Sequence, residues 1–362
     1  MVSVAQLLKE MPDGYEEACF KEKAIQRKRG ITAPGDLMML CLFHLLNGCS
    51  LIEISEVARL TGLGDFSDVA FMKRFECCNG WFKWIVSKLF TGGAVQHQKP
   101  AWLKDYKVIA VDASDVTEKG RSGRLYHLHF ALDLFKMESL QYNITTQDTG
   151  ESLKNFAVSE NDLFVGDRAY GTLAGIGHCL NNRGSFVLRI RKNCFKMYDD
   201  DKTVDLLKHL KSIKGDEVLN LNVYAIDEKK QRIRLRVCAT RKSEEAIAKA
   251  YKKMRRKESK KQLPIADDTK EFNEYIILVT NLPKIIKAVQ VLDLYRLRWQ
   301  VEIHFKRLKS ILDYGELPKR RSESVMAWLN GKIMISLLIE RIIGREVFSP
   351  SGECCAEHMA RD

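Results

Sequence analysis

The spacing of apolar residues changes once along this chain, and that change limits the folds available to it. Up to about residue 100 the apolar positions recur at helical spacing, in runs at 37–46, 51–60 and 69–90. From about residue 105 strand-like runs take over, at 108–111, 125–134 and 137–146. A tight connection at Phe135 and Lys136 fits a hairpin. We therefore expect a helical N-terminal region followed by three sequential antiparallel strands.

Helix and strand candidates alternate beyond these three strands. They are a helix near 152–159, a strand at 163–165, a helix at 173–181 and a strand at 185–191. A further strand candidate lies at 275–280. Three strands followed by alternating helix and strand predict an α/β fold with a mixed sheet.

Residues 192–272 are surplus to a compact core of this kind, and we expect them to form a β-rich insertion. Strand candidates at 218–226 and 232–237 precede a basic helix that begins at Ser243. Three arginines, Arg232, Arg234 and Arg236, alternate with apolar residues, so one strand face would present three guanidinium groups. That face could follow a DNA backbone or could simply be solvated.

Two aspartates directly follow buried strand patterns. Asp112 ends the apolar run 108–111, and Asp167 follows the run 163–166. A carboxylate at such a place can project toward solvent and a metal ion, although an Asp that caps a turn has the same setting. Asp115 is the main rival of Asp112, but it would face the opposite side of a continuing strand.

Four polar residues, Tyr295, Arg298, Glu302 and Lys309, fall within an arc of roughly 60° on one helix. An apolar stripe runs beside them, at Leu294, Leu297, Val301, Phe305, Leu308 and Leu312. This pattern predicts one amphipathic helix that buries the stripe and holds the acid rigidly. The two cations could clamp phosphate or pair with Glu302.

These motifs resemble those of bacterial insertion-sequence transposases of the DDE superfamily, in the insertion-sequence-four-like group with the YREK signature. Tyr295-x2-Arg298-x3-Glu302-x6-Lys309 is similar to that signature. VDAS at 111–114 and DRAYG at 167–171 are similar to the motifs of the first and second Asp. Many relatives carry Gly where Ala113 and Ala169 stand here. The resemblance covers about residues 100–345 and implies an RNase H-like mixed-sheet catalytic core.

The resemblance also implies a role for each of these side chains. Asp112, Asp167 and Glu302 would be catalytic and would bind two Mg²⁺ ions, which Mn²⁺ can replace; two such ions about 4 Å apart can stabilise the attacking and leaving oxygens of a phosphodiester. Tyr295, Arg298 and Lys309 would bind DNA phosphate. We expect three supporting residues, Arg168, Tyr170 and Trp299; packing or a structural salt bridge explains the first two at least as well, and a Trp beside an apolar stripe is more often part of the core.

A transposase of this group would cleave double-stranded DNA at the transposon ends and join those ends to target DNA. By analogy it would act by cut and paste through a hairpinned end, within a homodimeric synaptic complex. Two alternatives stay open, a catalytically decayed DNA-binding derivative and an RNase H-like nuclease without strand transfer. The formal net charge of +12 agrees with an anionic partner.

Cysteine usage and hydropathy predict an intracellular protein with no membrane segment, and the resemblance implies a bacterial cytoplasmic protein that is associated with the nucleoid when bound to DNA. The ten cysteines include no C-x2-C spacing, and a zinc site at His127 and His129 is not favoured. We divide the chain into a helical region (1–100), a catalytic domain (101–191 and 273–345), the insertion (192–272) and a short tail (346–362). The helical region either binds DNA ends through a helix-turn-helix or is an ordinary helical hairpin. Because the tail is short, this copy of the transposase could be truncated at its C-terminus.

Overall fold

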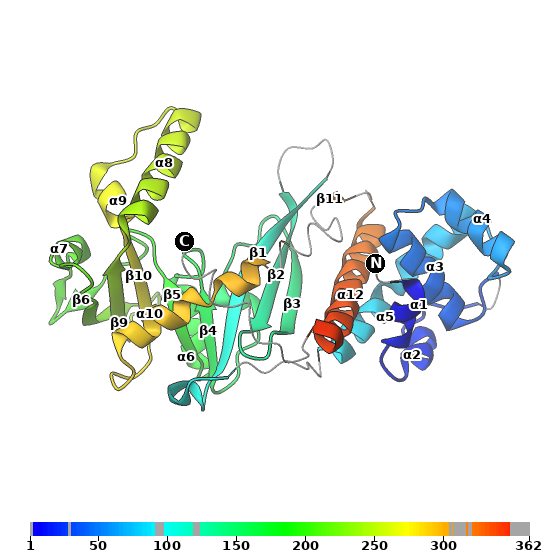
Figure 1. Cartoon of the computed structure of the whole chain (residues 1–362), viewed down its shortest axis with the longest axis horizontal. Helices are drawn as coiled ribbons and strands as arrows, with labels where there is room; N and C mark the ends of the chain where they lie inside the picture. Colours follow the sequence, from blue (N-terminus) through cyan, green and yellow to red (C-terminus); the bar gives the residue numbers. More distant parts are fainter. Residues whose placement is uncertain are drawn as a thin grey trace.

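The N-terminal helices gather at one end of the molecule, and a sheet with further helices fills the rest (Figure 1). The computed structural model describes residues 3–27, 30–90, 98–118, 124–303, 306, 316–317 and 321–347. The N-terminal helices are α1 (Val4–Lys9), α2 (Tyr15–Lys21), α3 (Pro34–Leu46), α4 (Leu51–Thr61) and α5 (Asp68–Leu89). The three helices that the apolar spacing predicts are thus confirmed as α3, α4 and α5.

A short turn joins α4 to α5. Gly62 ends α4 in the left-handed region, at φ 74°, and the Ser67 hydroxyl accepts a hydrogen bond from the Ala70 N–H at the start of α5. The predicted cap and turn are therefore present. Two helices joined in this way fit a DNA-binding helix-turn-helix and an ordinary helical hairpin alike.

The long helix α12 (Ser322–Val347) packs along α5 (Figure 1). A Cβ at Gly331 would lie 2.5 Å from a methyl carbon of Leu45, so glycine allows α12 to approach α3 closely. The catalytic segment that we predict to extend to residue 345 therefore ends in a helix that packs among the N-terminal helices. Its apolar face is complemented by helices some 250 residues earlier in the chain, which no local pattern reveals.

One mixed sheet forms the centre of the molecule. Its strands among the described residues are β1 (Lys107–Glu118), β2 (Arg124–Asp133), β3 (Glu138–Thr146), β4 (Asp162–Gly166), β5 (Ser185–Arg189), β6 (Tyr198–Asp199), β7 (Lys202–Thr203), β8 (Leu219–Ile226), β9 (Arg232–Arg241), β10 (Tyr275–Thr280) and β11 (Glu316–Leu317). The order is β3-β2-β1-β4-β5-β10-β9-β8-β6-β7, and β11 pairs with β1.

The strand directions confirm the predicted mixed α/β sheet. β1, β2 and β3 are antiparallel neighbours, while β4 and β5 run parallel to β1. The Asp133 carboxylate accepts from the Phe135 and Lys136 N–H groups, both at 3.0 Å, which fixes the turn between β2 and β3. Helix α6 (Leu173–Asn181) links β4 to β5. This order is consistent with an RNase H-like core. The helix expected near 152–159 is only a short 3₁₀ turn, Leu153–Asn155.

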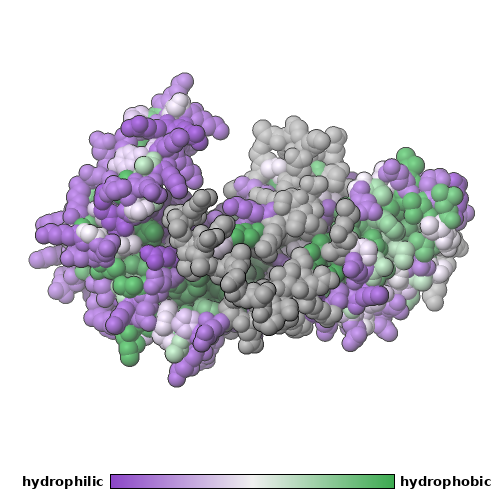
Figure 2. All heavy atoms as spheres, in the orientation of Figure 1, coloured by the Kyte–Doolittle hydropathy of each residue, from purple (hydrophilic) through white to green (hydrophobic). Residues whose placement is uncertain are grey.

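The strands of the insertion extend the central sheet, since β9 pairs with β10 and β8 with β9. Its helices are α7 (Leu206–Lys211), α8 (Glu244–Lys261) and α9 (Asp267–Phe272), and the surface that α8 and α9 present is largely hydrophilic (Figures 1 and 2). The prediction that three arginines of β9 share one exposed face is wrong for Arg236. Arg236 is buried and donates to the Pro283 and Ile286 carbonyl oxygens, at 3.1 and 2.8 Å.

Two apolar clusters cover the faces of the sheet. One contains Val108, Ala110 and residues of α10 (Ala288–Arg296) and α12, and the other contains Ile109, Val111 and residues of α6. No helix in the described part of the chain is long and apolar enough to cross a membrane.

Candidate active site

Asp112 and Asp167 lie side by side where β4 ends. β1 and β4 are paired in parallel from Lys107 opposite Asp162 to Ala110 opposite Val165. Two residues further along the same register, Asp112 comes opposite Asp167. Because side chains alternate along a strand, both carboxylates lie on the face that carries α10. The sequence predicts that Asp112 follows the end of its strand, but β1 continues to Glu118. The strand that ends at this level is the neighbouring β4.

The predicted single helix from Tyr295 to Lys309 is interrupted. Helix α10 ends at Arg296, the Leu297 and Arg298 N–H groups donate to carbonyls three residues back, and helical structure resumes at Trp299. Despite the interruption, Val301 is buried as the apolar stripe requires.

Tyr295, Arg298 and Glu302 meet across this interruption. The Arg298 guanidinium donates to the Glu302 carboxylate, with 2.5 Å between Nη2 and Oε1, and its Cζ lies 5.6 Å from the centre of the Tyr295 ring. Burial alone would lower the pKa of Arg298, but Tyr295, Glu302 and Asp112 together raise it. The pairing of Arg298 with Glu302, which the sequence left as an alternative to phosphate binding, is therefore present. Lys309, Phe305, Leu308 and Leu312 lie outside the described residues.

Several polar atoms at this face have no partner among the described residues. They are Nε of Arg298, the hydroxyl of Tyr295 and Oε1 of Gln300, all of which are buried. A guanidinium offers five N–H donors, so Arg298 keeps donors for another acceptor while it contacts Glu302.

Burial and neighbouring negative charges raise the pKa of the Asp112 carboxyl. Burial raises its pKa to about 6; the Ala113 N–H and Arg298 lower it, while Asp167 and Glu302 raise it further. The three acids of the sequence hypothesis therefore interact through their charges. Among the described residues, however, no three His, Cys, Asp or Glu side chains are already arranged to hold a metal ion.

Glu151 is an acid of this site that sequence reasoning missed. It follows β3 in the loop before Leu153, and burial together with Asp167, Asp112 and Asp115 raises its pKa to about 7. No apolar run precedes Glu151, so no strand-end signal marked it. Only the fold brings this loop to Asp112 in the middle of β1 and to Asp167 at the end of β4.

Asp115 faces away from Asp112, as expected for a continuing strand. Its carboxylate lies 2.7 Å from Nε2 of His127 on β2. His129 contacts the Thr145 hydroxyl, 2.9 Å from Nε2, and burial followed by the charge of His127 lowers its pKa to about 4. These contacts give both histidines a structural role on the opposite face of the sheet.

The three supporting residues differ in setting. Tyr170 is fully buried, with its ring centre 6.3 Å from that of Phe156, which indicates packing. Trp299 is 42% exposed beside Arg298 and remains accessible to a ligand. Burial, then Arg189, lowers the pKa of Arg168 to about 10, although Tyr295 and Asp167 oppose the shift.

Comparison with known proteins gives a consistent result. Residues 103–338 match the model of the family described as transposase DDE domain. The chain is 23% identical over 342 residues to the putative transposase InsL for insertion sequence element IS186A of Escherichia coli (strain K12), covering 92% of this chain and 91% of that protein. It is also 23% identical over 343 residues to the transposase for insertion sequence element IS421 of Escherichia coli, with the same coverage.

A shorter match has higher identity. Over 141 residues the chain is 31% identical to the transposase for insertion sequence element IS1151 of Clostridium perfringens, covering 39% of this chain and 30% of that protein.

Proposed function

Because this chain belongs to the transposase DDE domain family, we propose that it cleaves DNA at the ends of an insertion sequence and joins those ends to target DNA by cut and paste, with Asp112, Asp167 and Glu302 as its catalytic acids. It is an insertion-sequence transposase, an enzyme that acts on DNA. The observation that supports these acids best is their position: two lie in register at neighbouring strands, and the third comes from the segment packed over the same face.

The family generally uses a divalent metal ion, and the donor set here fits Mg²⁺ or Mn²⁺. Three carboxylates supply the hard oxygen ligands that Mg²⁺ prefers. The raised pKa of Asp112 reflects burial first and the negative charges of Asp167 and Glu302 after it, and a bound cation would favour the charged form against both. Two bound ions would supply charge stabilisation for the attacking and leaving oxygens of the phosphodiester. Asp112 and Asp167 would hold them from the sheet, and Glu302 from the opposite side.

Arg298 would orient the DNA strand. It contacts Glu302 through one of its donors while its Nε has no partner within the described ranges, so it could bind a phosphate and still position Glu302. Tyr295 would add its hydroxyl, and Lys309 a further charge. Trp299, exposed beside Arg298, would stack on a displaced base.

Assembly belongs to the same proposal. We infer a homodimeric synaptic complex that holds two transposon ends, with excision through a hairpinned end. Arg168 would support the acids from its place beside Asp167. Tyr170, which fills the core beneath, would fix the loop that carries Asp167 and Arg168.

The products of a reaction with labelled DNA test this function. Duplexes carrying the element's ends are incubated with a supercoiled target plasmid and Mg²⁺, with a chelator in the matched control. Ends joined to the plasmid only with Mg²⁺ are the expected result. Nicked ends without joined product would indicate a nuclease, and DNA binding without any product would indicate a decayed transposase; either outcome contradicts the proposal.

A further inference from the structure

Four cations gather beside the acids, at the ends of three strands: Arg168, Arg189, Arg191 and Lys242. We call them the cationic cluster. β4 and β5 are parallel, with Val165 opposite Val187, so two residues on Asp167 comes opposite Arg189. Arg189 therefore continues the row formed by Asp112 and Asp167, on the same face of the sheet.

Lys242 lies on the same face as this row of Asp112, Asp167 and Arg189, two strands further across the sheet. Arg189 pairs with Leu278 on β10, and Leu278 pairs with Cys238 on β9. Lys242 lies four residues beyond Cys238, so alternation places it on the same face at the end of β9. The Lys242 N–H donates to the Glu274 carbonyl oxygen at 2.9 Å, which continues the pairing of β9 with the β10 side.

The loop that carries Arg168 rests directly on the end of β5. A Cβ at Gly171 would lie 2.6 Å from the Arg189 carbonyl oxygen, so this loop reaches the strand as closely as a backbone can. Arg168 and Arg189 are thereby held together by the fold and not by a flexible surface contact.

The four cations of the cluster make no ion pair within the described residues. Asp167, Glu151 and Glu274 act on Arg168, Arg191 and Lys242 only through their charges. Nε of both Arg168 and Arg189 is buried without a hydrogen-bond acceptor. Leaving a buried charge unpaired is costly, and proteins normally avoid it.

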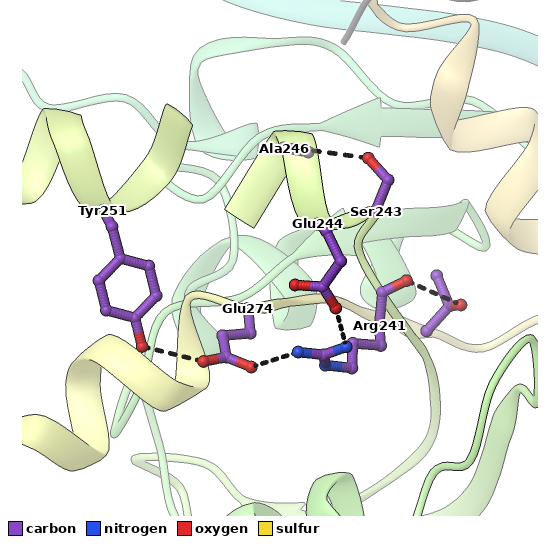
Figure 3. A network of polar contacts seen from close by, with 7 residues as sticks. Arg241, Ser243, Glu244, Ala246, Tyr251 and Glu274 are labelled. Atoms are coloured by element: carbon purple, nitrogen blue, oxygen red, sulfur yellow. Dashed lines mark hydrogen bonds and ion pairs between the residues drawn. The ribbon is translucent and has the colours of Figure 1, made fainter. Parts of the chain in front are cut away.

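Two nearby arginines show how the same sheet treats cations with a structural role. Arg236 is buried but donates to two backbone carbonyls. Arg241, next to Lys242, donates to the Glu244 carboxylate at 2.5 Å and to Glu274 at 3.3 Å, while Glu274 also accepts from Tyr251 (Figure 3). Arg241 is thus paired with acids within the protein, whereas the ammonium of its neighbour Lys242 donates to the Asn273 carbonyl oxygen and makes no ion pair within the described residues.

The arginines of the cationic cluster also affect the pKa of Lys242. Burial lowers the pKa of Lys242 to about 8, and Arg189 and Arg168 lower it further, although Glu274 raises it. A bound anion would relieve this repulsion.

We propose that the cationic cluster is a second phosphate-binding site, which holds a DNA backbone phosphate beside the one at the acids. This inference rests on the proposed function. The guanidinium groups of Arg168 and Arg189 would bind the phosphate oxygens in pairs, and Lys242 would add a point charge. Arg298 lies near Asp112, so the DNA strand would be held at two places beside the acids.

The salt dependence of DNA binding tests the site independently of catalysis. The affinity for a fluorescent duplex carrying the element's end is measured by anisotropy, without divalent metal, over a range of KCl concentrations. We compare the wild type with Arg189→Gln and Lys242→Gln, and with Arg241→Gln as the matched control. Each phosphate contact contributes about 0.9 to the slope of log affinity against log salt.

We expect Arg189→Gln and Lys242→Gln to weaken binding by about tenfold and to reduce the slope by about 1, with Arg241→Gln near the wild type. We also expect Arg189→Gln to keep or raise the melting temperature, because it removes a half-buried charge that has no ion pair within the described residues. Equal slopes for all four proteins, or a lower melting temperature of Arg189→Gln with an unchanged slope, would overturn the site.

The two proposals can fail separately. If the wild type joins ends to target DNA but the slopes are equal, the cationic cluster is not a phosphate site and the function stands. If the slopes differ as expected but no joined product forms, the site stands and the proposed function fails.

Discussion

The contact between α5 and α12 and the candidate active site treat buried polar groups in opposite ways. Between the helices, the Asn330 amide donates to Asn79 at 2.7 Å and accepts from the Tyr142 hydroxyl at 2.7 Å. At the active site, the Tyr295 hydroxyl and Nε of Arg298 are buried with no partner within the described ranges. The first region is built for stability, and the second keeps its polar atoms for a ligand.

The same contrast holds for charge. Neighbouring acids add to the raised pKa of Asp112, and neighbouring cations add to the lowered pKa of Lys242, although both sets lie a few residues apart on one face. Such an arrangement lowers the stability of the protein on its own. It becomes favourable when a metal cation and a phosphate anion are bound, so activity and stability should respond in opposite directions to mutations here.

The largest stability effect should come from the helical region. Trp81 is fully buried, stacks near Phe82 with 6.1 Å between ring centres, and donates through Nε1 to the Tyr15 carbonyl oxygen at 2.7 Å. We expect Trp81→Ala to lower the free energy of unfolding by about 3–5 kcal/mol, measured by urea denaturation. Trp299→Ala is the matched control and should cost under about 0.5 kcal/mol. Similar losses for both would remove the contrast between the regions.

Asp112→Asn should separate activity from stability. The substitution removes a carboxylate that needs a cation, so we expect cleavage to fall by about 10²–10³-fold or more. Without metal at pH 8, the free energy of unfolding should rise by up to about 3 kcal/mol, since the raised pKa means that the charged form is unfavourable in the folded state.

Asp115→Asn is the control for Asp112→Asn, because Asp115 pairs with His127 on the opposite face. It should keep cleavage activity and gain no stability. An Asp112→Asn protein that is both active and less stable than the wild type would contradict our interpretation of the site.

Asn330→Ala tests the paired polar groups between the helices. Removing the amide leaves Asn79 and Tyr142 without their partner, and we expect a loss of about 1–3 kcal/mol by urea denaturation. A double-mutant cycle with Asn79→Ala should show that the two losses are not additive. Additive losses would mean that the contact contributes little.

The smallest effect should be a pH dependence from Glu151. Its pKa in the folded protein, about 7, exceeds the ordinary value of 4.5, so its contribution to stability is complete below about pH 4.5 and is lost as the pH rises through 7. We expect Glu151→Gln to match the wild type at pH 4.5 and to be more stable at pH 8 by about 1 kcal/mol, after allowance for solvent screening. Thermal melting at both pH values checks this; equal stability at pH 8 would contradict it.

Local patterns predicted the elements that local residues determine. The range 173–181 is the observed α6, and 275–280 is the observed β10. The spacing of side chains on strands also placed Asp115 and Asp112 on opposite faces correctly.

Long-range packing decided the rest. No Gly or Pro marks the interruption at Leu297 and Arg298, which the sequence alone presents as continuous helix. Arg236 is buried because carbonyls at Pro283 and Ile286, about 50 residues later, accept its hydrogen bonds. Glu151 reaches the acids only through the loop after β3. The strand-end acids could be proposed early because a strand pattern followed by Asp is a local signal.

The most direct test of the account is the cleavage and joining of labelled element ends in Mg²⁺ by Glu302→Gln, with Asp293→Asn as the matched control. Asp293 is an acid of α10 that pairs with Arg296 at the surface, so its loss changes the charge equally without touching the site. We predict that Glu302→Gln binds the ends as the wild type does but neither cleaves nor joins them, while Asp293→Asn does both. Joining at the wild-type rate by Glu302→Gln would show that this acid does not act with Asp112 and Asp167.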